Sequence, residues 1–231
     1  MKHAKRHPLI FGTIILTATG LITRVIGFFY RIYLSRLFGE EGMGIYQLLS
    51  PALSLSFSLT AAGYQTAISK YVAADSAKRP SGNLKPLLAG TSITLPLSLV
   101  TNAILFFSAD PIGIFLLKDH RTVPMLRILS FSVPFAALHA CINGYFYGKK
   151  KASVPALTQL LEQLARVSCV FLVTGADLAE GRTPSINAAV LGLTVGEIFS
   201  MLIALVCLYI HLYPDSSILS CLLYTSDAAD E

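Results

Sequence analysis

Charged residues are scarce in this chain, and their scarcity excludes a water-soluble fold. They make up 13% of the 231 residues, against roughly a quarter in an ordinary soluble domain. Hydrophobic residues make up 54%, and the mean hydropathy is +0.63. Because a soluble fold cannot cover so much apolar surface, the composition predicts an integral membrane protein.

The sequence also lacks the motifs of common enzymes and metal sites. It contains no Walker loop, no HExxH motif and no convincing serine, cysteine or histidine triad. Cys141, Cys169 and Cys207 lie inside apolar stretches without paired spacing, so they indicate neither a disulfide framework nor a metal site. His139 also lies inside an apolar stretch, and we interpret it as a core histidine rather than a ligand. We therefore predict no enzyme activity, cofactor or metal.

Six apolar blocks divide the chain, each of about 20 residues or more, which is the length that a helix needs to cross a hydrocarbon core of about 30 Å. They cover approximately residues 9–37, 43–71, 87–107, 123–147, 154–175 and 186–212. The first block exceeds the apolar region of a signal peptide and no cleavage site follows it, so we expect it to be retained. The blocks predict an all-α membrane domain of six helices, with a cytoplasmic segment at 1–8 and a cytoplasmic linker that starts at 213–220.

The basic residues predict the orientation in the membrane. The formal charge is +5 and the isoelectric point is near 9.0, but the lysines and arginines gather at block ends rather than on one face, so we expect no nucleic-acid partner. Ten of them fall on the side of the N-terminus: Lys2, Lys5, Arg6, Lys70, Lys78, Arg79, Lys85, Lys149, Lys150 and Lys151. Three fall on the other side: Lys118, Arg121 and Arg182. This bias places the N-terminus in the cytoplasm.

Proline and glycine mark turns and irregular helices. Gly39 and Gly42 predict a turn after the first block. Pro51, Pro96 and Pro134 lie within blocks, where each removes a helix hydrogen bond, and they predict either the broken helices of a transporter or plain packing kinks.

Two glycine pairs at helical spacing predict places where helix backbones approach closely. They are Gly144 with Gly148 and Gly192 with Gly196. Such pairs occur in any helix bundle, so they predict packing rather than a particular function.

Arginine inside the first block is the most informative chemical feature. Arg24 and Arg31 are seven residues apart and project from nearly the same helix face, with Gly27 between them leaving room for a ligand or a partner helix. Buried arginine is costly and usually faces a wet cavity, and its planar fork of donors suits phosphate. The alternatives are snorkelling to the headgroups or pairing with carboxylates. Snorkelling is the favoured reading for Arg36, near the outer end.

Four further charged residues inside the blocks are candidates for charge coupling. Glu162 and Arg166 have the spacing and order of an intrahelical ion pair. Glu197 has no local partner, and we leave open whether it titrates as a proton or cation site or neutralises Arg127. Arg127 lies near the outer boundary, where snorkelling is the usual explanation.

Four stretches carry a resemblance to a known superfamily. They read TRVIGFFYR (23–31), LFGEEGMGIYQ (37–47), GYQTAISK (63–70) and NGYFYG (143–148). These stretches resemble the multidrug/oligosaccharidyl-lipid/polysaccharide flippase superfamily, and within it the stage V sporulation protein B-like polysaccharide biosynthesis family, which is related to the lipid II flippase. The likeness extends over the six blocks and is most specific in the first.

The resemblance implies the N-terminal lobe of a MATE-like bundle whose two lobes rock about a central cavity. It implies export of a polyprenyl-pyrophosphate-linked sugar by alternating access across a bacterial plasma membrane. Arg24 matches the arginine of a serine-arginine pair in the lipid II flippase, with Thr23 in place of the serine, and Arg31 lies one residue later than the second arginine of that flippase. The implied substrate-binding set is Thr23, Arg24, Gly27 and Arg31. The implied partners are the lipid-linked sugar, membrane lipids and a C-terminal lobe of the same chain.

The leading hypothesis is therefore a flippase for a lipid-linked oligosaccharide or a peptidoglycan precursor. The alternatives are a cation-coupled multidrug exporter of the same fold and a non-transporting membrane scaffold for envelope assembly. A membrane glycosyltransferase is disfavoured because no carboxylate pair lies in an extended loop.

The last eleven residues break with the apolar pattern. Residues 221–231 read CLLYTSDAADE, a string that resembles the translation of a transposon-derived sequencing adapter. We therefore expect the native reading frame to end near Ser220 and the chain to be an N-terminal fragment.

Overall fold

The computed structural model describes residues 8–78 and 84–213. The cytoplasmic segment predicted for residues 1–8, except Pro8, lies outside the described residues. So do the linker beyond residue 213 and the whole adapter-like tail at 221–231.

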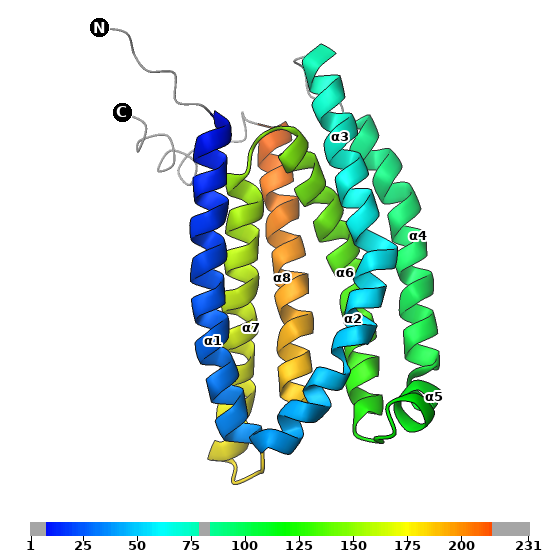
Figure 1. Cartoon of the computed structure of the whole chain (residues 1–231), viewed down its shortest axis with the longest axis vertical. Helices are drawn as coiled ribbons and strands as arrows, with labels where there is room; N and C mark the ends of the chain where they lie inside the picture. The colour runs from blue at the N-terminus through cyan, green and yellow to red at the C-terminus, as the bar shows by residue number, and fades with distance from the viewer. Residues whose placement is uncertain (1–7, 79–83, 214–231) are drawn as a thin grey trace, which may run out of the picture.

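Every regular element in the described part of the chain is helical, which confirms the predicted all-α class. The long helices are α1 (Pro8–Leu48), α3 (Gly63–Lys78), α4 (Lys85–Phe107), α6 (Thr122–Gly148), α7 (Ser153–Ala179) and α8 (Asn187–Leu212). Shorter elements are α2 (Ser50–Phe57), α5 (Ala109–Pro111) and the π-helical segments η1 (Ser58–Ala62) and η2 (Ile112–Leu116). Figure 1 shows the long helices side by side in one bundle.

Within the described residues, five stretches are long and apolar enough to cross a membrane, whereas the sequence predicted six blocks. The difference arises because the first two blocks merge into one helical stretch of 65 residues, Gly12–Ser76. At 1.5 Å per residue it would extend about 98 Å, roughly three times the hydrocarbon thickness. Figure 1 shows how it fits: α1 runs down one side of the bundle, and the chain returns upward through α2 and α3.

The reversal begins at Gly39, where the sequence predicted a turn. Its φ of 68° lies in the left-handed region, which glycine enters without the steric cost that a side chain imposes. Helical hydrogen bonding resumes directly afterwards, so a kink replaces the expected loop. The remaining four blocks coincide with α4, α6, α7 and α8 to within four residues at each end.

Proline does not break the helices in which it lies. Pro96 and Pro134 are inside α4 and α6, which continue through them, and Pro51 occupies the first turn of α2, where a missing N–H is tolerated. The broken-helix alternative is therefore wrong for Pro96 and Pro134. At Pro51 the second block is interrupted, because α1 ends at Leu48 and α2 begins at Ser50. The regular hydrogen-bond pattern also changes at η1, which contains no proline.

The outer surface of the bundle is apolar. Large hydrophobic side chains remain exposed along the helices, among them Phe107 at 79% and Leu172 at 73%. Contiguous apolar surface on this scale marks contact with lipid or with another protein. Together with the apolar spans, it identifies a multi-pass membrane protein.

Close backbone contacts hold the inner helices together, as the glycine pairs predicted. A Cβ atom at Gly144 would lie 2.6 Å from the carbonyl oxygen of Gln65 in α3, closer than real Cβ contacts allow. A Cβ at Gly196 in α8 would lie 3.0 Å from the carbonyl oxygen of Glu162 in α7. These contacts fix α6 against α3 and α8 against α7, and the second of them positions the polar side chains described below.

Candidate functional site

The arginines of α1 differ from every other arginine in the described part of the chain. Arg24, Arg31 and Arg36 are exposed, and no described carboxylate lies within ion-pair distance of them. The other described arginines each pair with a carboxylate: Arg121 with Glu41 and Asp119, Arg127 with Asp110, Arg166 with Glu162, and Arg182 with Asp177 and Glu180. The pairing alternative for Arg24 and Arg31 is therefore wrong within the described residues.

Arg31 borders a small cavity at the junction of α1 with α2, α6 and α8. The cavity has a volume of about 180 Å³, and its wall includes the polar side chains of Tyr46, Gln47 and Ser50. The Arg31 guanidinium can therefore contact a ligand in this cavity without movement of α1. The structure does not bring Arg24 to this cavity.

Thr23 and Gly27 have local roles in helix packing. The Thr23 hydroxyl donates to the carbonyl oxygens of Thr19 and Gly20, both at 3.0 Å, so its hydrogen is used within its own helix. A Cβ at Gly27 would lie 3.5 Å from the amide nitrogen of Gln163 in α7, an ordinary van der Waals contact. The partner helix predicted beside Gly27 is therefore α7.

Arg127 does not meet Glu197. Its Nη2 atom lies 2.5 Å from Oδ2 of Asp110, and its guanidinium carbon lies 5.9 Å from the ring centre of Phe106. About half of the Arg127 side chain is exposed. The hypothesis that Glu197 neutralises Arg127 is therefore wrong, because α5 supplies a nearer carboxylate that the apolar blocks did not reveal.

Glu162 and Arg166 form the intrahelical ion pair that their spacing predicted. The Arg166 Nη2 donates to Oε1 of Glu162, one turn earlier in α7. Both side chains are about four-fifths buried. An ion pair this sheltered is costly to break, because removal of one partner leaves the other charge without compensation.

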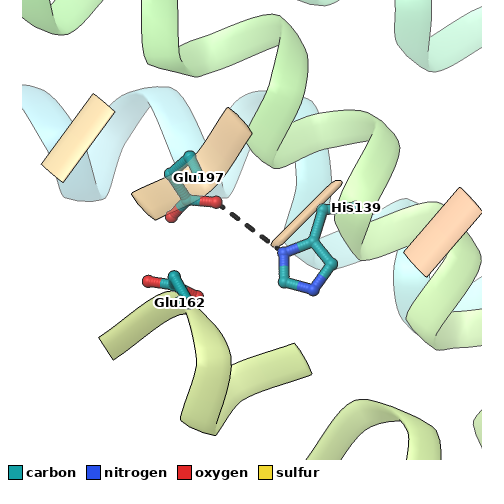
Figure 2. A group of neighbouring side chains, drawn as sticks. All are labelled: His139, Glu162 and Glu197. Carbon is teal, nitrogen blue, oxygen red and sulfur yellow. Dashed lines mark ion pairs between the residues drawn. The ribbon is translucent and has the colours of Figure 1, made fainter. Parts of the chain in front are cut away.

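A cluster of three titratable side chains lies deeper in the bundle. His139 of α6 points its Nδ1 toward Oε2 of Glu197 in α8 at 3.7 Å, and Glu162 of α7 approaches the same point (Figure 2). One nitrogen or oxygen atom from each side chain lies within 4.8 Å of the other two. We call these three residues the acid-histidine cluster. The sequence singled out each residue but did not join them, because they come from three helices.

Hydrogen bonds hold His139 in place. Its Nε2 atom lies 2.8 Å from the amide nitrogen of Asn143 and 2.9 Å from the hydroxyl of Ser200. The Ser200 hydroxyl also lies 3.3 Å from the carbonyl oxygen of Thr158, so this network links α6, α7 and α8. His139 is buried, as predicted for a core histidine, but its neighbours are charged as well as polar.

A separate charged group lies at the end of the bundle that is away from the start of α1. Arg121 donates from Nη2 to Glu41 at 2.7 Å and to Asp119 at 3.0 Å, which ties the far end of α1 to the loop before α6. The hydrogen bonds from Arg121 hold the pKa of the Asp119 carboxyl below its usual range. Arg121 and Glu41 are exposed and Asp119 is partly exposed, and we assign the group a structural role.

The sequence is similar to those of known proteins. The chain matches the family described as polysaccharide biosynthesis protein over residues 9–227. It is 36% identical over 197 residues to stage V sporulation protein B of Bacillus subtilis (strain 168), which covers 85% of this chain and 38% of that protein. It is 27% identical over 179 residues to lipid II flippase MurJ of the same organism, which covers 74% of this chain and 32% of that protein.

The chain therefore spans about a third of the length of these relatives. No solved structure matches the sequence. Because the family match covers nearly the whole chain, the protein belongs to the polysaccharide biosynthesis protein family, in agreement with the resemblance that its first helix carries.

Proposed function

We propose that this chain is the N-terminal lobe of a flippase that moves a polyprenyl-pyrophosphate-linked sugar across a bacterial plasma membrane by alternating access. The substrate is an oligosaccharide or a peptidoglycan precursor. The N-terminus faces the cytoplasm. A second bundle, expected from the part of the relatives' length that this chain does not span, closes the other side of the cavity.

The observation that carries the proposal is the pair of exposed arginines on α1. Arg24 and Arg31 differ by about 20° around the helix and by about 10.5 Å along it. Arg24 lies about 24 Å along the helix from Pro8, well inside the span. A guanidinium at that depth is costly unless a ligand or a cavity receives it, and pyrophosphate offers oxygens that match its donors. Of the relatives named above, one is itself a lipid II flippase.

A cation-coupled multidrug exporter of the same fold is the second candidate, because Glu162 and Glu197 border a cavity of about 240 Å³. An exporter of cationic compounds needs free carboxylates in its cavity. Arg166 already compensates one of the two, so the acid-histidine cluster is a poorer match for a cationic drug than the α1 arginines are for a phosphate.

The test replaces Arg24 in the full-length protein. We expect Arg24→Ala to abolish translocation of a lipid-linked precursor in reconstituted vesicles while membrane insertion stays near normal, because the change removes a phosphate donor rather than a packing contact. Arg24→Lys should restore part of the activity, since an ammonium keeps the charge but not the planar fork. Arg36→Ala is the matched control, because Arg36 lies on the same helix, about 120° from Arg24 around its axis.

Each outcome decides between the candidates. A fully active, well-expressed Arg24→Ala protein excludes a pyrophosphate role for this residue. Transport of cationic compounds but not of lipid-linked sugars would support the exporter. If loss of both Arg24 and Arg31 leaves growth and envelope assembly intact in the host strain, the scaffold alternative stands instead.

A further inference from the structure

We propose that Glu162 and Glu197 jointly bind one proton inside the bundle, and that this proton drives the proposed transport. The two carboxylates come from two helices, α7 and α8 (Figure 2). The backbones of these helices are held close at Gly196. The binding of the proton stands on the geometry of the acid-histidine cluster. Its use in transport rests on the proposed function.

The charge count of the cluster is the first argument. Two carboxylates face one guanidinium, that of Arg166, which pairs with Glu162. Among the described residues, His139 is the basic side chain within ion-pair distance of Glu197. With a neutral imidazole and both carboxylates ionised, the cluster carries one uncompensated negative charge within helices apolar enough to span a membrane. Such a charge is costly, and two close carboxylates share a proton in preference to ionising together.

The tautomer of His139 is the second argument. The amide nitrogen of Asn143 can only donate, so the Nε2 atom of the ring accepts from it, and the neutral ring carries its hydrogen on Nδ1. That Nδ1–H faces the Glu197 carboxylate at 3.7 Å. His139 is therefore a positioning residue that orients Glu197, while the carboxylates hold the exchangeable proton.

The same features favour a proton over a divalent metal ion. A divalent cation would give the cluster a net positive charge beside Arg166. The Nδ1–H of His139 also presents a donor to the site, whereas a cation held by all three side chains requires a lone pair there. One proton leaves the cluster neutral and needs no rearrangement of the ring.

Water can reach the cluster. The acid-histidine cluster borders the cavity of about 240 Å³, which is also lined by the polar side chains of Gln65, Asn143 and Gln159. That volume holds several waters, which relay protons through hydrogen bonds. The titratable and charged groups that face the two carboxylates are Arg166 from α7, and His139 and Tyr147 from α6. The elements α2 and α3 contribute Phe57 and Gln65, which do not titrate.

Infrared spectroscopy of the purified chain tests the binding directly. A carboxyl group that holds a proton absorbs at the carboxylic-acid stretching frequency, apart from ionised carboxylates. We expect one such band to persist near neutral pH and to disappear as the pH rises, and we expect it to be lost in Glu197→Gln. The control is Glu180→Gln, in which an exposed loop carboxylate is removed, and it should keep the band.

Three results would overturn the binding. The first is the absence of a carboxylic-acid band in the folded wild-type chain at neutral pH. The second is a titration seen instead in the ¹⁵N resonances of His139, which would place the proton on the ring. The third is a shift of the carboxylic-acid band or of the His139 ¹⁵N resonances on addition of Zn²⁺ or Na⁺ at constant pH, which would identify a cation site. Because all three are read from the wild-type chain, a misfolded variant does not obscure the result.

Vesicles that contain the full-length protein test the coupling. We expect an imposed pH gradient to accelerate translocation by the wild type and by Glu180→Gln, and we expect this acceleration to be lost in Glu197→Gln. A gradient response that Glu197→Gln retains would overturn the coupling even if the infrared band is present. If the wild type moves no lipid-linked precursor at all, the proposed function fails, while the infrared result still decides the proton site.

Discussion

At the scale of single residues, the buried Arg166–Glu162 pair and the exposed Arg127–Asp110 pair should contribute differently to the stability of the protein. Arg166→Gln leaves Glu162 buried without its counter-charge, and we expect a loss of about 3–5 kcal/mol of stability. Glu162→Gln/Arg166→Gln removes both charges and should recover most of that loss. The measurement is the midpoint of thermal unfolding of the purified protein in detergent.

The matched control is the Arg127–Asp110 pair, in which both side chains are about half exposed. Arg127→Gln should change stability by at most about 1 kcal/mol, because solvent screens the pair. Equal losses for Arg127→Gln and Arg166→Gln would contradict the burial argument. The sequence predicted the Arg166 pair, since its partner lies one turn away in the same helix. It did not predict the partner of Arg127, because Asp110 lies outside the apolar blocks.

The acid-histidine cluster was still harder to predict from the sequence. Sequence reasoning selected Glu162 and Glu197 as charges inside apolar blocks and set His139 aside as a core residue. No spacing rule links residues on three helices, so only the packing of α6, α7 and α8 reveals that they meet. A buried titratable residue in each of three consecutive apolar blocks was the available signal.

At the scale of helices, alanine substitutions should distinguish glycines at helix contacts from glycines on the open surface. Gly144→Ala forces a methyl group to within 2.6 Å of the Gln65 carbonyl oxygen, and because this neighbour is backbone it cannot turn aside. We expect a loss of about 1–3 kcal/mol from overpacking between α6 and α3. Thermal unfolding in detergent measures it.

Gly175→Ala is the control for this change. Gly175 lies in α7, and a Cβ there has nothing within 4 Å, so the alanine should be neutral or raise stability by about 0.5–1 kcal/mol. Destabilisation by Gly175→Ala as large as that of Gly144→Ala would show that backbone effects, not the contact with α3, decide the result. The glycine pairs predicted these close contacts correctly, whereas the partner helix of each could not be read from one sequence.

Helix boundaries were predicted best where polar loops separate the blocks. Four helices agree with the sequence because loops rich in glycine, proline and charge end them. The first two blocks were predicted as separate helices, but the glycines and glutamates that follow Gly39 do not end the helix, and helix formation continues after the kink. The π-helical segment η1 had no sequence signal, because its residues, SLTAA, suit an ordinary helix equally well.

At the scale of the whole molecule, the fold sorts the basic loops as the predicted orientation requires. Figure 1 shows the end of α3, the start of α4 and the connection between α6 and α7 at the same end of the bundle as the start of α1. The α5 region and the connection between α7 and α8 lie at the other end. The segments rich in lysine and arginine therefore share one end, which the positive-inside rule assigns to the cytoplasm.

Lys118 and Lys150 offer a matched pair for testing this orientation. Both residues are exposed, and both have a left-handed backbone, with φ of 56° and 59°. Lys118 lies in the connection before α6 and Lys150 in the connection between α6 and α7. Figure 1 shows these two connections at opposite ends of the bundle. Any strain from Lys118→Cys or Lys150→Cys is therefore common to the two. In a background where the native cysteines are replaced by alanine, we expect an impermeant thiol reagent to label Lys118→Cys on intact cells and Lys150→Cys only after the membrane is opened. Labelling of Lys150→Cys on intact cells, with Lys118→Cys protected, would reverse the orientation. It would also reverse the direction of the pH gradient relative to the acid-histidine cluster, because the cavity around Glu162 and Glu197 keeps its place within the bundle.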